Sequence, residues 1–135
     1  MATDKKRKNK LVKWANEAII ANDKVYKNGE VLNESYNGQI AAFSVAVAIS
    51  GLKPAMALYY SDSDKSNIEK KRIVELLASM YDKDDNNTDK LSGGEALFKK
   101  VIGANDKEEV DLRRTIIEYA IALKLVIRTF KFKKS

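Results

Sequence analysis

The fold of this chain is decided by the stretch 35–59, SYNGQIAAFSVAVAISGLKPAMALY. Apolar residues alternate with Ser and Ala in its first half, as they do in a β-strand: Phe43, Val45, Val47 and Ile49. Interspersed alanines and a length beyond that of most strands favour a helix instead. We therefore predict a buried helix over residues 35–50, which Gly51 ends.

A second helix should follow at once, because Pro54 stands near its first position, where proline loses no hydrogen bond. Apolar residues at helical spacing predict further helices on both sides of this pair. The expected ranges are about 10–28, ended by Gly29; 66–82; about 93–102, between a Ser92–Glu95 capping box and Gly103; and about 107–130, where Asp106 and Glu109 repeat the capping pattern. The alternating residues 130–133 are compatible with an extended segment.

These elements predict an all-α fold, a single compact helical bundle of five to six helices with short connecting loops. The 135 residues correspond to one domain, and a hydrophobic content of 44% is sufficient for a core. We expect a flexible basic tail over residues 1–9 and a single α-helical domain over 10–135.

The composition excludes several classes of site. The chain has no Cys and no His, which removes disulfides, thiolate zinc sites and every Ser-His-Asp triad. The longest uncharged run, 35–52, contains too many polar residues and glycines to cross a lipid bilayer. We expect no membrane association and a cytoplasmic location.

Three motifs suggest chemistry, and each has a simpler explanation. The acidic segment 82–89 resembles the start of an EF-hand loop, but Asn87 and Gly93 stand where calcium needs Gly and Glu. Ser92-Gly93-Gly94 lacks the rest of a phosphate-binding loop. Paired carboxylates occur in the first turn of a helix, where acids stabilise its positive end: Glu108, Glu109 and Asp111. We expect a solvated loop at 82–89, no metal, no cofactor and no enzymatic activity.

The distribution of charge points to an anionic partner. The formal net charge is +6, from 25 basic and 19 acidic residues. Residues 1–13 carry +5, residues 119–135 carry +5, and the body between them carries −4. Nucleic acid is the expected partner, contacted through phosphates without base specificity. The candidate residues lie near the two ends and on one middle helix: Lys10, Lys13, Lys70, Lys71, Arg72, Lys124, Arg128 and Lys131, the last three being placed on one face of the final helix.

Two stretches carry a resemblance to a known family. One is Tyr36-Asn37-Gly38 with Ser50-Gly51-Leu52 and Ala55-Met56-Ala57-Leu58-Tyr59; the other is the ending 114–130, with Glu118-Tyr119-Ala120. The chain resembles the small α-helical subunit of the type III-B (Cmr) CRISPR RNA-guided effector complex. The Lys-rich N-terminus and the acidic segment 82–89 depart from that family's pattern.

The resemblance implies a non-catalytic subunit that acts in antiviral defence. Its implied partners are RAMP-fold backbone subunits, the large subunit of the complex, other copies of itself stacked head to tail, and the guide RNA with its target RNA. Two other interpretations of the residues stay open. One is a helix-turn-helix DNA regulator, which the apolar opening Pro54-Ala55-Met56 disfavours. The other is a protein adaptor whose charge only maintains solubility.

Overall fold

The computed structural model describes residues 2–61 and 68–133, which form six helices and one small sheet. The helices are α1 (Ala2–Ala21), α2 (Ser35–Ser50), α3 (Leu52–Tyr59), α4 (Ile68–Lys83), α5 (Gly94–Ile102) and α6 (Asp106–Ile127). The strands are β1 (Tyr26–Lys27), β2 (Glu30–Val31) and β3 (Lys131–Phe132). The predicted all-α bundle is confirmed, and the predicted start of the fourth helix at residue 66 lies outside the described residues.

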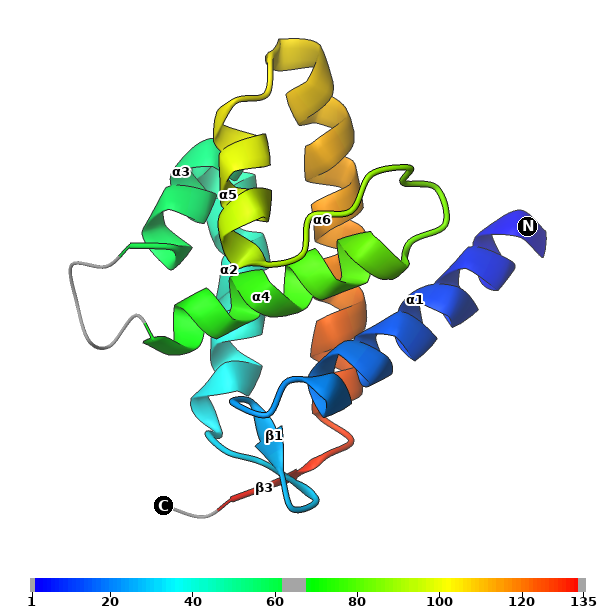
Figure 1. Ribbon diagram of the computed structural model, residues 1–135, viewed down its shortest axis with the longest axis vertical. Coiled ribbons are helices and arrows are strands. Elements are labelled where there is room, and N and C mark those ends of the chain that lie inside the picture. Colours follow the sequence, from blue (N-terminus) through cyan, green and yellow to red (C-terminus); the bar gives the residue numbers. More distant parts are fainter. Residues whose placement is uncertain (1, 62–67, 134–135) are drawn as a thin grey trace.

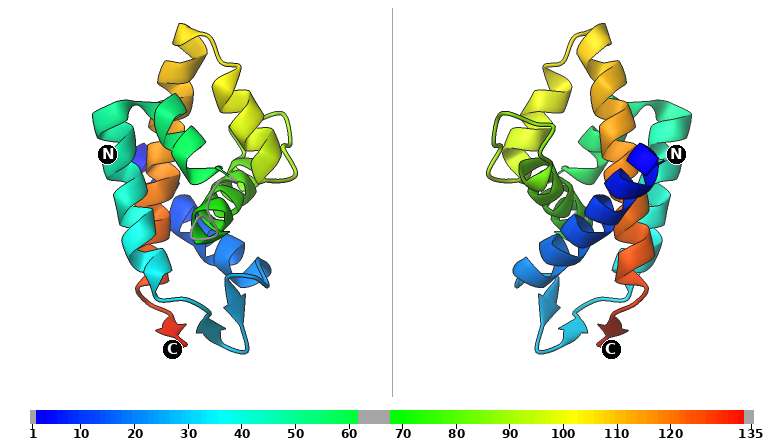
Figure 2. Two further views of the ribbon diagram at one scale, coloured as in Figure 1. Left: turned by 90° about the vertical axis from the view of Figure 1, so that its left-hand side faces the viewer. Right: turned by 90° about the vertical axis from the view of Figure 1, so that its right-hand side faces the viewer.

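Helix α6 is the central element of the bundle. It packs against α1, α2 and α4, and α4 in turn contacts α1, α2, α3 and α5 (Figure 1). Figure 2 shows α1 running obliquely along α6. The helix buries large side chains along most of its length, among them Ile116, Tyr119 and Leu123. Each neighbouring helix therefore shares one core with α6.

Helix α2 buries one stripe rather than its whole surface. The buried residues recur at helical spacing: Tyr36, Ile40, Phe43 and Val47. Val45 and Ile49 are 56% and 80% exposed. The helix is confirmed, but the prediction that it is buried is wrong, because residues that alternate along a chain fall on different faces of a helix.

The turn between α2 and α3 depends on Gly51. Its backbone, at φ 94° and ψ 165°, lies in a region essentially restricted to glycine. Its N–H donates to the Val47 carbonyl at 2.9 Å, which completes the last turn of α2. The reversal brings Tyr59 edge-to-face against Phe43, with ring centroids 5.0 Å apart.

The N-terminal region differs from the prediction. Residues 1–9 were expected as a tail, but α1 begins at Ala2, so the expected boundary at residue 10 is corrected. The helix ends at Ala21 instead of continuing to Gly29. Asn28 and Gly29, both with positive φ, form a two-residue hairpin turn between β1 and β2.

Two helix starts also differ from the predicted ones. Helix α5 is preceded by Gly93, and no side chain caps it, so the Ser92–Glu95 capping box is wrong. Helix α6 does have a capping box, formed by Asn105 and Glu108 one residue earlier than predicted. Gly103 ends α5 as predicted, and residues 131–132 are extended in β3.

Replacing Gly51 by Ala should destabilise the fold by about 1–3 kcal/mol, because Ala is strained at this φ and ψ. A Cβ there would meet only Pro54 Cδ at 3.7 Å, so the cost is conformational rather than steric. Gly38 is the matched control: it lies inside α2 with open space around it, and Gly38→Ala should stabilise by about 0.5–1 kcal/mol. Urea unfolding measures both changes. Equal effects of the two substitutions would contradict the conclusion that the backbone conformation at position 51 requires glycine.

Candidate nucleic-acid interface

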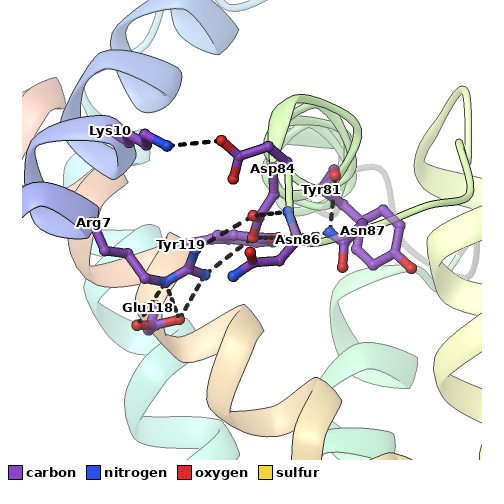
Figure 3. Close-up of polar contacts among 9 residues, drawn as sticks. Arg7, Lys10, Tyr81, Asp84, Asn86, Asn87, Glu118 and Tyr119 are labelled. Carbon is purple, nitrogen blue, oxygen red and sulfur yellow. Dashed lines mark hydrogen bonds and ion pairs between the residues drawn. The ribbon is translucent and has the colours of Figure 1, made fainter. Parts of the chain in front are cut away.

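A buried ion pair joins the start of α1 to the loop after α4. Asp84 is 1% exposed, and it accepts two hydrogen bonds from the Arg7 guanidinium, at 3.0 Å from Nη2 and 3.3 Å from Nη1. The same guanidinium donates to Glu118 of α6, with Nη2 to Oε1 at 3.0 Å (Figure 3). Arg7 therefore connects three parts of the chain that are far apart in sequence.

Further donors satisfy the buried carboxylate. The Tyr119 hydroxyl donates to Asp84 Oδ2 at 2.7 Å, and the Asn86 backbone N–H donates to Oδ1 at 3.0 Å. Asn87 donates in turn to the Tyr119 hydroxyl at 3.1 Å. A buried charge is tolerated only when it is paired and hydrogen-bonded in this way. We call Arg7, Asp84, Glu118 and Tyr119 the Arg7 network.

The ionisation of the Arg7 network follows from these contacts. Burial alone would raise the pKa of Asp84, but hydrogen bonds from Arg7, Asn86 and Tyr119 outweigh it and hold that pKa below its ordinary value. The pKa of Tyr119 is raised, by burial first and then by its hydrogen bond to Asp84. Hydrogen bonds to Asp84 and Glu118 raise the pKa of Arg7. Asp84 is thus an anion and Arg7 a cation at neutral pH.

The outward side of α1 carries cations that have no acidic partner among the described residues. We call these four exposed lysines the α1 basic face: Lys5, Lys6, Lys8 and Lys13. Glu17, an acidic residue on the same helix, faces Lys83 instead, with 3.7 Å between Nζ and Oε1. A phosphate chain could therefore approach this face without displacing an existing ion pair.

A second group of cations lies at the sheet. We call these five exposed residues the sheet-end cluster: Lys24, Lys27, Arg128, Lys131 and Lys133. The register pairs Lys27 with Glu30 and Glu30 with Lys131, so the three side chains share one face of the sheet. The other face carries Tyr26, Val31 and Phe132, which pack against the core. No member of the cluster forms an ion pair with a described residue.

The structure separates the predicted site residues instead of joining them. Lys10 pairs with Asp85 at 2.8 Å, whereas Lys13 belongs to the α1 basic face. Lys124, Arg128 and Lys131 do not share a helix face, because α6 ends at Ile127 and Lys131 lies on β3. Arg128 follows the end of α6 and Lys131 lies on β3, both exposed, while Lys124 is half-buried on α6.

The third predicted group, at the start of α4, contacts neighbouring aromatic rings and an acid. Lys70 and Lys71 lie over Tyr59 and Tyr60, with Nζ 5.7 Å and 4.9 Å from the ring centroids. Arg72 pairs with Glu75 at 2.8 Å. This end of α4 lies far from the start of α1 (Figure 1), so the predicted residues do not form one continuous track.

Sequence reasoning missed other residues that the structure places in these groups. Lys5, Lys6 and Lys8 were assigned to a tail, and their helical placement was not foreseen. Lys27 was overlooked as a site residue, although the Asn28-Gly29 pair next to it is a strong hairpin signal. Asp84 was assigned to a solvated loop, and that assignment is wrong because the side chain is buried against Arg7 and Tyr119.

A membrane-spanning helix and a metal-binding cluster are both absent among the described residues. No described helix has the length and apolar character needed to cross a bilayer. Within residues 5–61 and 69–133, no group of three or more acidic side chains is arranged to hold a metal ion.

Asp84→Asn should lower the free energy of unfolding at neutral pH by about 1–3 kcal/mol, because a buried hydrogen-bonded charge is lost. Since the folded pKa of Asp84 lies below the unfolded one, its contribution is complete above about pH 4 and declines as the pH falls through the folded pKa. Urea unfolding across the acid range should thus show a weaker acid dependence in Asp84→Asn than in the unmodified chain. Asp85→Asn, which removes an exposed carboxylate paired with Lys10, is the matched control, because an exposed ion pair contributes little to stability. Equal acid dependence in all three proteins would contradict the conclusion that Asp84 is a buried carboxylate whose ionised form stabilises the fold.

Comparison with known proteins identifies the family to which the chain belongs. The family described as CRISPR-associated protein (Cas_Cmr5) matches residues 5–130, which covers nearly the whole chain. No curated protein and no solved structure matches it. The match includes all six helices except the first residues of α1. The chain therefore belongs to the Cas_Cmr5 family, the small subunits of the type III-B (Cmr) CRISPR effector complex.

Proposed function

We propose that this chain is a non-catalytic subunit of the Cmr complex that contacts the phosphates of the guide RNA and its target RNA. The family places the chain in an effector complex with other subunits. The observation that carries the proposal is that the sheet-end cluster and the α1 basic face are exposed and form no ion pair with a described residue. Cations that already pair with acids contribute less to binding, because RNA must compete with those acids.

The arrangement supports contact with backbone phosphates rather than with bases. Lysines are flexible point charges, and phosphate contacts carry no sequence information directly. The sheet that carries these cations is fixed to the core by Val31 and by the edge-to-face contact of Tyr26 with Phe130, whose ring centroids are 5.3 Å apart. Its cations are thus presented on a supported surface. Binding should be independent of sequence and should weaken steeply with added salt.

Removing three cations of the sheet-end cluster tests this proposal. The triple variant Lys27→Gln/Arg128→Gln/Lys131→Gln should bind single-stranded RNA more weakly, with a salt slope smaller by about 2, given roughly 0.7 per phosphate contact. Fluorescence anisotropy of a labelled oligouridine over a salt series measures both quantities.

The matched control removes the same charge from cations that already have partners. Lys10, Lys99 and Arg114 face Asp85, Glu95 and Asp111 at 2.8 Å, 3.1 Å and 3.9 Å. The control Lys10→Gln/Lys99→Gln/Arg114→Gln should retain most of the salt slope. An equal loss in both triple variants would show that only net charge matters and would count against the assigned surface.

We also propose that the exposed apolar face of α2 contacts protein neighbours in the complex, either RAMP-fold backbone subunits or another copy of the chain. Ala42, Val45 and Ile49 lie on one side of α2, and all three are exposed. Ile49 is 80% exposed and Val45, one turn earlier on the same side, is 56% exposed, and contiguous exposed apolar surface of this kind supports a protein contact.

Val45→Ser/Ile49→Ser should reduce incorporation of the chain into the Cmr complex without lowering its own stability. Neither side chain contributes to the core, so the free energy of unfolding should change by less than about 0.5 kcal/mol. Affinity purification of the assembled complex, followed by quantification of this subunit, is the measurement. Val110→Ser, at a 58% exposed position on α6, is the control and should incorporate normally. Normal incorporation of the double variant would exclude the α2 face as an interface.

A further inference from the structure

The α1 basic face is arranged unfavourably for an isolated helix. Lys5 and Lys8 are spaced i,i+3, and Lys6 and Lys10 are spaced i,i+4, so like charges neighbour one another. Lys5 also stands in the first turn of α1, at the positive end of the helix dipole, where cations are disfavoured. Left alone, this end of α1 should fray.

Apolar packing does not hold this part of the helix. Within residues 5–21, the first buried side chain is Leu11. Residues 5–10 are attached to the body by three ion pairs, two made by Arg7 and one by Lys10. The orientation of Lys5, Lys6 and Lys8 therefore depends on polar contacts.

The ion pairs made by Arg7 and by Lys10 differ in strength. Lys10 meets Asp85, whose carboxylate is 58% exposed, and an exposed pair of this kind contributes little. Arg7 is 24% exposed and meets Asp84 through two parallel hydrogen bonds at a site that is 1% exposed. Two-point contact between a guanidinium and a carboxylate fixes direction as well as distance.

We propose that the Arg7–Asp84 ion pair is a positioning contact, which holds the α1 basic face in one orientation so that it can bind a phosphate chain. Arg7 itself does not need to touch RNA. Its guanidinium is occupied by Asp84 and Glu118, and Asp84 is in turn fixed by the Tyr119 hydroxyl and the Asn86 backbone N–H (Figure 3). This inference rests on the proposed function, because it concerns RNA binding through one of the two basic surfaces.

Two neutralising substitutions in one loop separate positioning from charge. Asp84→Asn and Asp85→Asn each raise the net charge by one, so simple attraction predicts that both bind RNA as tightly as the unmodified chain or more tightly. If the Arg7–Asp84 ion pair positions the α1 basic face, Asp84→Asn should instead weaken RNA binding. Asp84→Asn should bind a labelled oligouridine on the order of tenfold more weakly than Asp85→Asn, with a smaller salt slope.

A second matched pair lies on the helix itself and covers the case in which Asp84→Asn does not fold. Arg7→Gln and Lys10→Gln each remove one cation from α1; the first removes the ion pairs with Asp84 and Glu118, and the second removes the ion pair with Asp85. Arg7→Gln should bind RNA more weakly than Lys10→Gln, although both carry the same net charge. Circular dichroism of each variant identifies which pair has retained its fold.

Amide hydrogen exchange of residues 5–10 supplies a readout that does not involve RNA. Exchange should accelerate in Asp84→Asn and Arg7→Gln and stay unchanged in Asp85→Asn and Lys10→Gln. If the unmodified chain binds RNA, then unchanged amide exchange in Asp84→Asn and Arg7→Gln, or equal RNA affinity within each pair of variants, would overturn the positioning role of the Arg7–Asp84 ion pair. Absence of RNA binding by the unmodified chain would instead overturn the proposed function, and the positioning role would fall with it.

Discussion

The ion pair between Arg7 and Asp84 is the contact on which much of this structure depends. It places a charged carboxylate at a position that is 1% exposed, which is tolerated because Arg7, Tyr119 and the Asn86 N–H surround that carboxylate with donors. Through it the beginning of α1, the loop after α4 and the middle of α6 are joined. Apolar burial holds the rest of α1, from Leu11 onward, against α6.

This arrangement explains how a basic chain can be both folded and available to an anionic partner. Acidic residues of the body pair with selected cations, Arg7, Lys10 and Arg72 among them, and those pairs serve the fold. The cations without an acidic partner among the described residues include those on the outer side of α1 and those at the three-stranded sheet. The family places the chain in a Cmr complex, and we propose that RNA of that complex is the counterpart of these surfaces.

The sequence was sufficient to predict the helical class and the Gly51 turn, since both follow from local spacing and backbone conformation. It was insufficient for Asp84, because a run of Asp and Asn has the composition of a solvated loop and its partner Arg7 lies 77 residues away. The joint position of Lys27 and Lys131 depends on strand pairing across the whole chain. Asn28-Gly29 was a local hairpin signal that helical periodicity obscured.

A double-mutant cycle on Arg7 and Asp84 tests the central claim most directly. The free energies of unfolding of Arg7→Met, Asp84→Asn, the double variant and the unmodified chain give the coupling between the two side chains without reference to RNA. The account predicts a coupling of about 1–3 kcal/mol, with the double variant less destabilised than the sum of the single ones. Additive effects within about 0.5 kcal/mol would show that the pair does not hold α1 to the body.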